Sequence, residues 1–166
     1  MAAEDPFGDV LEANGAYVEG FALRGIPGSA NRGLTIITCM DSRIEPLDML
    51  GLQPGDAKIL RNAGARVTDD VLRALVLGVY LLGVRRAMVI AHTDCRMVVG
   101  DEEEVHSAIE QSGGPDTRSL SFLTTADQAA SLRKDVRRIE HWPYLQDLAV
   151  GGFLYEVETG RLTRVV

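Results

Sequence analysis

Short apolar runs alternate along this chain with segments of helical periodicity, and this alternation restricts the fold more than any other feature. Strands are predicted at residues 34–38, 57–61, 87–91, 148–157 and 161–166. Helices are predicted at residues 7–21, 46–52, 71–82, 101–111 and 126–141. Because strands joined through helices pair in parallel, we expect an α/β fold with a mostly parallel central sheet of about four strands, flanked by helices. The last strand follows a tight turn and is expected to be an antiparallel edge strand at the C-terminus.

The length of 166 residues suits one domain, so residues 1–166 are predicted to fold as a single unit. The first predicted helix carries apolar residues at helical spacing, namely Phe7, Val10, Leu11, Val18 and Phe21. An apolar stripe of this kind needs a surface against which to be buried. We therefore expect residues 1–24 to form an N-terminal helical arm that packs on a partner subunit.

Charge and hydropathy argue against two classes of partner. The net charge of -7 provides no basic face for nucleic acid or for an anionic membrane. The longest apolar run, residues 74–82, is far shorter than the roughly 20 residues that a membrane-spanning helix needs. The acidic N-terminus has no apolar signal-peptide core, so we expect a cytoplasmic protein.

The chain has two cysteines, and each follows a predicted strand. Cys39 opens the segment Cys39-Met40-Asp41-Ser42-Arg43, and Cys95 closes the segment His92-Thr93-Asp94-Cys95. Thiolate and imidazole are ligands that zinc prefers, and ligands gather at the carboxyl ends of parallel strands. The sequence therefore predicts a metal site of Cys39, His92 and Cys95. Three protein ligands leave a fourth position for water, which is typical of catalytic rather than structural zinc.

Asp41 and Arg43 form a second informative pair. Residues two apart on an extended segment point the same way, so an aspartate and an arginine at this spacing can form a bidentate ion pair. The arginine would orient Asp41, lower its pKa and keep it off the metal. If the pair broke, Asp41 could become the fourth metal ligand. The alternative is an ordinary surface ion pair, which contributes at most about 1 kcal/mol.

Other interpretations of the same residues remain open at this point. The cysteines could be small buried hydrophobes without a ligand. A phosphatase-type nucleophile is disfavoured because Arg43 lies four residues after Cys39, where that chemistry needs six. A thioredoxin-like pair is disfavoured because no Cys-x-x-Cys is present. Composition alone favours an ordinary turn at residues 61–64, and nothing in the sequence gives a role to His106 or His141.

Three motifs in this order resemble the β-class carbonic anhydrases, in their short microbial branch. They are Cys39-x-Asp41-x-Arg43, Arg61-Asn62-Ala63-Gly64 and His92-x-x-Cys95, and the closing residues 152–160 are also similar to that branch. The resemblance implies an α/β fold with a parallel core sheet. It also implies a homodimer, often paired into a homotetramer, with active sites near the subunit interface and the N-terminal helix on the partner subunit.

For the site, the resemblance implies one Zn²⁺ per subunit held by Cys39, His92 and Cys95. The fourth ligand would be water in an open form or Asp41 in a closed form, with Asp41 and Arg43 as the catalytic pair that switches between them. The implied reaction is the reversible hydration of CO2 to bicarbonate and a proton by zinc-bound hydroxide.

Two positions depart from the family pattern. Arg96 follows Cys95 where the family usually has glycine, and Ala65 follows Gly64 where the branch more often has a second glycine. A long cation beside a metal ligand keeps an alternative open, namely hydrolysis of carbonyl sulfide or carbon disulfide at the same site. A non-catalytic zinc-binding regulatory protein is the third alternative, and it would require Asp41 to stay on the metal.

Overall fold

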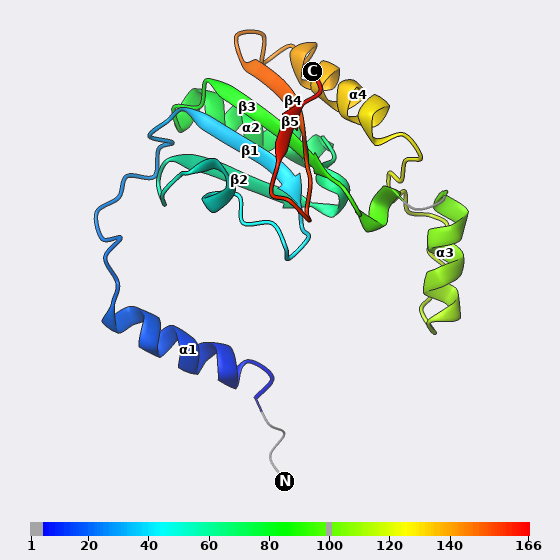
Figure 1. Cartoon of the computed structure of the whole chain (residues 1–166), viewed down its shortest axis with the longest axis horizontal. Coiled ribbons are helices and arrows are strands. Elements are labelled where there is room, and N and C mark those ends of the chain that lie inside the picture. The colour runs from blue at the N-terminus through cyan, green and yellow to red at the C-terminus, as the bar shows by residue number, and fades with distance from the viewer. Residues whose placement is uncertain (1–4, 99–100) are drawn as a thin grey trace.

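The computed structural model describes residues 5–98 and 101–166 (Figure 1). The strands are β1 (Leu34–Cys39), β2 (Ala57–Asn62), β3 (Arg86–His92), β4 (Ala149–Tyr155) and β5 (Leu162–Arg164). The α-helices are α1 (Gly8–Glu19), α2 (Asp69–Leu81), α3 (Glu102–Gln111) and α4 (Gln128–Glu140). Three short 3₁₀ turns are η1 (Asp48–Leu50), η2 (Ala63–Ala65) and η3 (Arg96–Val98). All nine of these strands and α-helices lie within two residues of their predicted bounds.

The strands form one sheet in the order β2-β1-β3-β4-β5. The first four are parallel, and β5 is antiparallel to β4, which confirms the predicted fold class. β1 and β3 are neighbours in the middle of the sheet, with Thr38 opposite Ile90. The ends of these two strands therefore meet at the same edge, and Cys39 and His92 are the residues at those ends.

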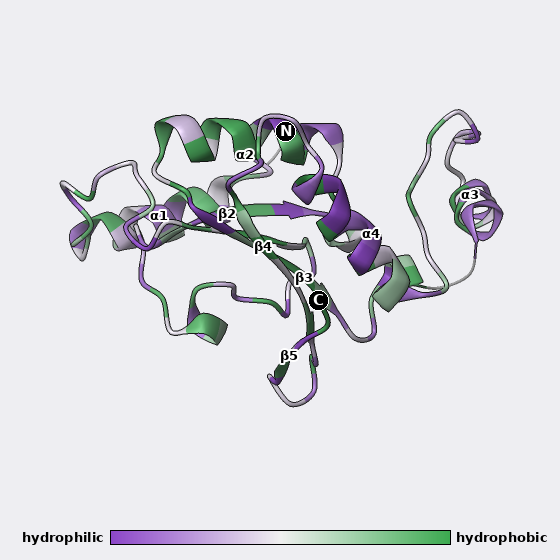
Figure 2. Ribbon diagram, turned by 90° about the horizontal axis from the view of Figure 1, so that it is seen from above, coloured by the Kyte–Doolittle hydropathy of each residue, from purple (hydrophilic) through white to green (hydrophobic). Residues whose placement is uncertain are grey.

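The two faces of the sheet bury different clusters. All six residues of β1 are buried, as expected of a central parallel strand. Ile37 points to the face that packs against α2 and α4, and Ile36 points to the face that packs against residues 47–52 and the β4–β5 hairpin. Figure 2 views the sheet edge-on, with α2 on one side and β5 on the other.

Side-chain caps begin the three helices α2, α3 and α4, where the sequence places Thr68, Asp101 and Asp127. The Thr68 hydroxyl accepts a hydrogen bond from the Val71 amide and so starts α2. Asp127 caps α4 in the same way through the Ala130 amide, at 2.9 Å. These caps satisfy amide groups that the first turn of each helix leaves without a partner.

The predicted helix at residues 46–52 is wrong, because this segment contains only the short turn η1. Its apolar residues Leu47, Met49, Leu50 and Leu52 all pack into the cluster on one face of the sheet. A helix would point these side chains in different directions, because successive residues are rotated by about 100°. Leu52 is buried and the other three are half-buried, and their packing on one face favours an irregular path around the turn η1.

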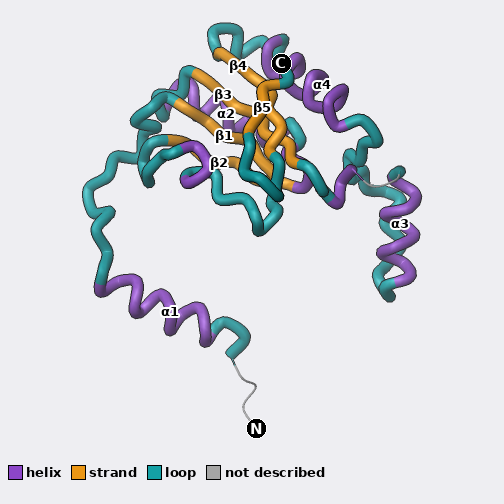
Figure 3. The backbone as a smooth tube through the Cα atoms, in the orientation of Figure 1, coloured by secondary structure: helices purple, strands orange, loops and turns teal. Residues whose placement is uncertain are grey.

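The helix α1 stands away from the sheet and is joined to β1 by a long loop (Figure 3). All of its residues are exposed, including Val10, Leu11 and Val18 of the predicted apolar stripe. Within residues 5–98 and 101–166, no helix is both long and apolar enough to cross a membrane.

Candidate metal centre

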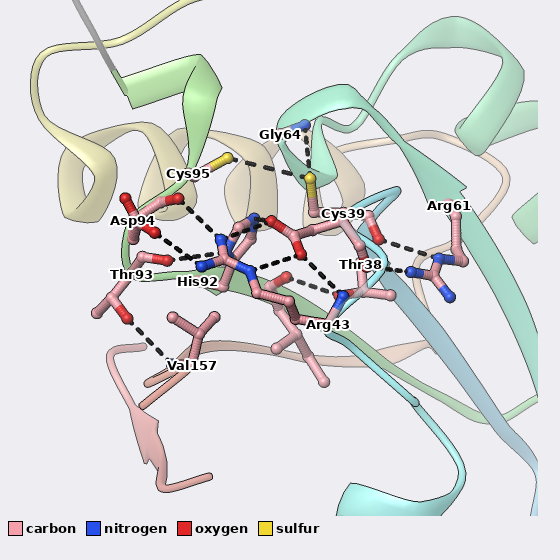
Figure 4. A network of polar contacts seen from close by, with 12 residues as sticks. Thr38, Cys39, Arg43, Arg61, Gly64, His92, Thr93, Asp94, Cys95 and Val157 are labelled. Atoms are coloured by element: carbon pink, nitrogen blue, oxygen red, sulfur yellow. Dashed lines mark hydrogen bonds and ion pairs between the residues drawn. The ribbon is translucent and has the colours of Figure 1, made fainter. Parts of the chain in front are cut away.

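The structure brings the three predicted ligands together. Cys39 ends β1, His92 ends β3, and Cys95 lies in the turn that follows β3. Their ligand atoms all lie within 4.8 Å of one another, and the two sulfur atoms are 4.0 Å apart (Figure 4). The three residues are only 4%, 1% and 5% exposed, respectively. The paired ends of β1 and β3 thus bring Cys39 and His92 together across 52 intervening residues to form one compact donor set.

The orientation of His92 favours a metal ion at this place. Its Nδ1 atom lies 2.9 Å from the carbonyl oxygen of Thr93, which can only accept, so Nδ1 carries the hydrogen. The Gln128 side chain also donates to the His92 carbonyl, at 2.8 Å. Nε2 therefore presents its lone pair, and it is buried without a hydrogen-bond partner among the residues that the structure describes. A buried imidazole lone pair beside two thiols is the donor set that zinc binds.

The protonation of the buried Cys95 thiol depends on whether a cation is bound beside it. Burial is the main cause that raises the pKa of the Cys95 thiol to about 11, and the neighbouring Cys39 contributes to this rise. Without a cation, Cys95 therefore keeps its proton at neutral pH. The backbone amide of Gly64, in the turn that follows β2, donates a hydrogen bond to the Cys39 sulfur at 3.4 Å.

Asp41 and Arg43 form the predicted bidentate pair. Arg43 Nε donates to Asp41 Oδ1 at 3.0 Å, and Arg43 Nη2 donates to Oδ2 at 2.8 Å. The Arg43 backbone amide also donates to Oδ1, at 2.9 Å. The side-chain and backbone hydrogen bonds from Arg43 hold the pKa of Asp41 far below its ordinary value. Asp41 Oδ2 lies 3.9 Å from His92 Nε2, so this ionised carboxylate stands beside the donor set while Arg43 holds it.

Asp94 is a site residue to which the sequence reasoning gave no role. It lies between the ligands His92 and Cys95 and adopts a left-handed backbone with φ of 54°. Its Oδ2 atom accepts a hydrogen bond from Arg43 Nη1 at 2.7 Å, and its carbonyl accepts one from Arg43 Nη2 at 3.1 Å. The only sequence signal was its position inside the His-x-x-Cys motif.

Residues 61–64, which composition alone favours as an ordinary turn, contact the metal centre directly. Arg61 donates to the carbonyl oxygen of Cys39 at 3.0 Å and to that of Asp41 at 2.6 Å. Gly64 has φ of 77°, and its amide points at the Cys39 sulfur. Ala65 also has a positive φ, of 57°, which explains why glycine suits this position better.

Three further residues named from the sequence, Arg96, His106 and His141, lie outside the donor set. Arg96 is exposed in η3 and lines a groove with Val105 and Ile109 of α3. His106 is buried against Thr117, with its Nδ1 atom 2.9 Å from the hydroxyl. His141 ends α4, where its Nδ1 atom lies 2.8 Å from a backbone carbonyl of the helix.

A buried Cys-His-Cys set at the carboxyl edge of a parallel sheet defines a zinc-dependent enzyme of the α/β class. Residues 34–162 match the family model described as carbonic anhydrase. The chain belongs to the carbonic anhydrase family, in its β class, and zinc is the cofactor of that family.

Relatives of the chain include proteins of two activities. β-Carbonic anhydrase 1 of Mycobacterium tuberculosis is 35% identical over 161 residues, which cover 95% of this chain and 96% of that protein. A carbonic anhydrase from Streptococcus mutans is 36% identical, with a TM-score of 0.91 and 99% of both chains covered. A carbon disulfide hydrolase of Acidianus sp. is 34% identical over 172 residues, covering 89% of this chain and 84% of that protein.

Proposed function

We propose that the protein catalyses the reversible hydration of CO2 to bicarbonate and a proton. The observation that carries this proposal is the buried set of Cys39, His92 and Cys95, beside which Arg43 holds Asp41 away from the free lone pair of His92. Three ligands and a restrained carboxylate leave a position for a reactant, as catalytic zinc requires.

Asp41, held by Arg43, prepares this position for the chemistry that bound zinc would supply. Bound zinc would lower the pKa of a water molecule towards 7 and so supply hydroxide as a nucleophile. Asp41 stays ionised, because Arg43 stabilises its charge, and it therefore acts only as a hydrogen-bond acceptor. An acceptor beside the donor set can orient a hydroxyl group for attack on a small electrophile.

A small cavity next to the donor set suits a substrate of few atoms. Gly64, Ala91 and Met97 are among its apolar lining residues. Met97 also packs against the cluster of Cys39, Ile44 and Cys95, so this cavity lies next to the donor set. CO2 is small and carries no net charge, and an apolar wall offers it a place without competing for the cation.

The direct test is stopped-flow CO2 hydration by zinc-loaded protein at about pH 6.5 and about pH 8.5, because a higher pH increases the hydroxide supply. We expect faster turnover at the higher pH and about one zinc per subunit. Asp41→Ala should nearly abolish turnover and keep its zinc, because three ligands remain. A zinc-loaded wild-type protein without hydration at either pH would contradict the proposal.

Hydrolysis of carbon disulfide or carbonyl sulfide remains the second candidate, favoured by the identity to the Acidianus protein. Rates with carbonyl sulfide and with CO2 on one preparation separate the two. A much faster reaction with carbonyl sulfide would promote this candidate. Arg96→Gly then tests whether the departure from the family pattern changes the preference.

A zinc-binding regulatory protein without turnover is disfavoured by the arrangement around Asp41. Such a protein needs Asp41 on the metal, whereas Arg43 engages both carboxylate oxygens of Asp41. Two charge-assisted hydrogen bonds in a fork geometry oppose that shift.

We also propose that the protein is a cytoplasmic homodimer or homotetramer in which the arm, residues 1–24, packs on a partner subunit. The exposed apolar side chains of α1 support this, since Leu11 is 61% exposed and Val18 is 63% exposed. Light scattering should show a dimer or larger for the wild type and smaller species for Val18→Glu. An oligomer unchanged by Val18→Glu would remove the arm from the interface.

A further inference from the structure

Asp94 is placed between two metal ligands at a cost to the backbone. Its φ of 54° is a left-handed conformation that costs roughly 1–2 kcal/mol for most residues, although aspartate tolerates it better than most. The residue is not needed as a cap, since it starts no helix. Strained non-glycine residues that persist beside a site are held there by their contacts, and the contacts of Asp94 are with Arg43.

Arg43 is shared between two carboxylates. Nε and Nη2 face Asp41, at 3.0 and 2.8 Å, while Nη1 faces the carboxylate of Asp94 at 2.7 Å. Nη2 also donates to the Asp94 carbonyl at 3.1 Å. The planar guanidinium is thus held along both of its edges, and one edge is anchored to the turn that carries His92 and Cys95 (Figure 4).

We propose that Asp94 is a positioning residue, which holds Arg43 in the orientation from which Arg43 clamps Asp41 beside the metal ligands. This inference rests on the proposed hydration reaction and adds to it a second partner for Arg43. Without Asp94, the Arg43 side chain, which is 45% exposed, has fewer contacts to keep it in that orientation. Asp41 is then less well fixed as an acceptor.

Three variants separate this role from a structural one. Asp94→Gly removes the carboxylate and relieves the backbone strain, so the fold is kept. Asp94→Asn keeps an oxygen that can accept from Arg43 Nη1 and tolerates the left-handed conformation. Asp70→Asn is the control, because Asp70 is similarly exposed and pairs with the exposed Arg73 of the same helix, α2.

The primary measurement is the hydrogen-exchange rate of the Arg43 Nε–H group by NMR in the zinc-loaded protein. In Asp94→Gly we expect this exchange to be faster by about fivefold, which is the upper range for loss of an exposed ion pair. Asp94→Asn should restore much of the protection. The Arg73 Nε–H group, which donates to Asp70, is the internal reference and should exchange at the wild-type rate in both Asp94 variants.

The second measurement is kcat/KM for CO2 hydration at equal zinc content. We expect it to fall by up to about fivefold in Asp94→Gly, to recover in Asp94→Asn and to stay unchanged in Asp70→Asn. Equal Arg43 exchange in the wild type and Asp94→Gly would overturn the inference, and so would faster exchange with an unchanged kcat/KM. If the wild type itself hydrates no CO2, the proposed function fails, while the exchange rates still decide whether Asp94 holds Arg43.

Discussion

The amide nitrogen of Gly64 lies 3.4 Å from the sulfur of Cys39 and donates a hydrogen bond to it. Two constraints reserve this position for glycine. Its φ is 77°, and a Cβ atom added there would lie 3.2 Å from Cβ of Met97. A turn after β2 therefore presents an amide to a metal ligand of β1, because no side chain intervenes.

Gly64→Ala should weaken both the fold and the metal site. The left-handed backbone costs alanine about 1–2 kcal/mol in free energy of unfolding. Displacement of the amide from the sulfur should also lower the affinity for zinc by about tenfold, a usual effect of losing an outer hydrogen bond to a ligand. Gly51→Ala is the matched control, since Gly51 has φ of 62° and open space around its Cβ position. It should lose similar stability and no zinc affinity, as measured by thermal denaturation and by competition with a chelator.

Asp135→Asn should strongly destabilise the protein. Asp135 of α4 and Arg66 form an ion pair at 2.7 Å in which the side chains are only 7% and 14% exposed. Removal of the negative charge leaves a buried guanidinium without compensation, which costs about 3 kcal/mol. The exposed pair of Asp70 and Arg73 provides the comparison, and Asp70→Asn should cost at most about 1 kcal/mol. If urea denaturation shows similar losses of unfolding free energy for the two variants, burial of the Asp135–Arg66 pair does not add to its contribution to stability.

Glu102 should make stability depend on acid pH. Its carboxylate accepts hydrogen bonds from the amides of Phe122, at 2.7 Å, and Thr124, at 3.1 Å. The bond from Phe122 is the main reason that the pKa of Glu102 lies below its ordinary value of 4.5. The stabilisation is therefore complete above that ordinary value and is lost as the pH falls through the lower pKa of the folded state. Between about pH 6 and about pH 3, the wild type should lose more unfolding free energy than Glu102→Gln. Parallel denaturation profiles for the two proteins would refute this.

Zinc uptake should release a proton from Cys95. The pKa of this thiol is about 11 in the metal-free protein, whereas zinc binds the thiolate. Zinc affinity should therefore rise with pH up to that value, because protons compete less with zinc for the Cys95 sulfur at higher pH. Calorimetric titration with zinc at about pH 8, in two buffers of different ionisation enthalpy, counts the protons. Cys95→Ser should release about one proton fewer, and an equal count would show that Cys95 is already ionised.

The parts of this molecule that follow from local pattern were predictable from the sequence. β1 and β3 are short apolar runs, and each delivers a ligand at its carboxyl end, so the donor set of Cys39, His92 and Cys95 could be proposed before the structure. The pair of Asp41 and Arg43 was also predicted, but the assumed extended segment is wrong. Residues 41–44 form a turn, in which the Ile44 amide donates to the Asp41 carbonyl at 3.2 Å, and this turn brings the two side chains together.

The contacts that depend on the backbone path could not be predicted. Asp94 reaches Arg43 only because its φ is positive, and Gly64 reaches the Cys39 sulfur only because a turn from another strand crosses it. The segment 46–52 failed for a related reason. The packing of Leu47, Leu50 and Leu52 against one face of the sheet is a tertiary contact, and it overrides the local preference for a helix.

The placement of β1 beside β3 has a consequence for how the protein acquires its metal. The segment of residues 92–95 offers two donors, and the third donor, Cys39, arrives only when β1 and β3 have paired across more than fifty residues of chain. A nascent or unfolded chain therefore lacks the complete donor set, and tight capture of zinc comes after the central sheet has formed. Bound zinc then stabilises the pairing of β1 and β3, because separation of the two strands would also separate the ligands and release the ion.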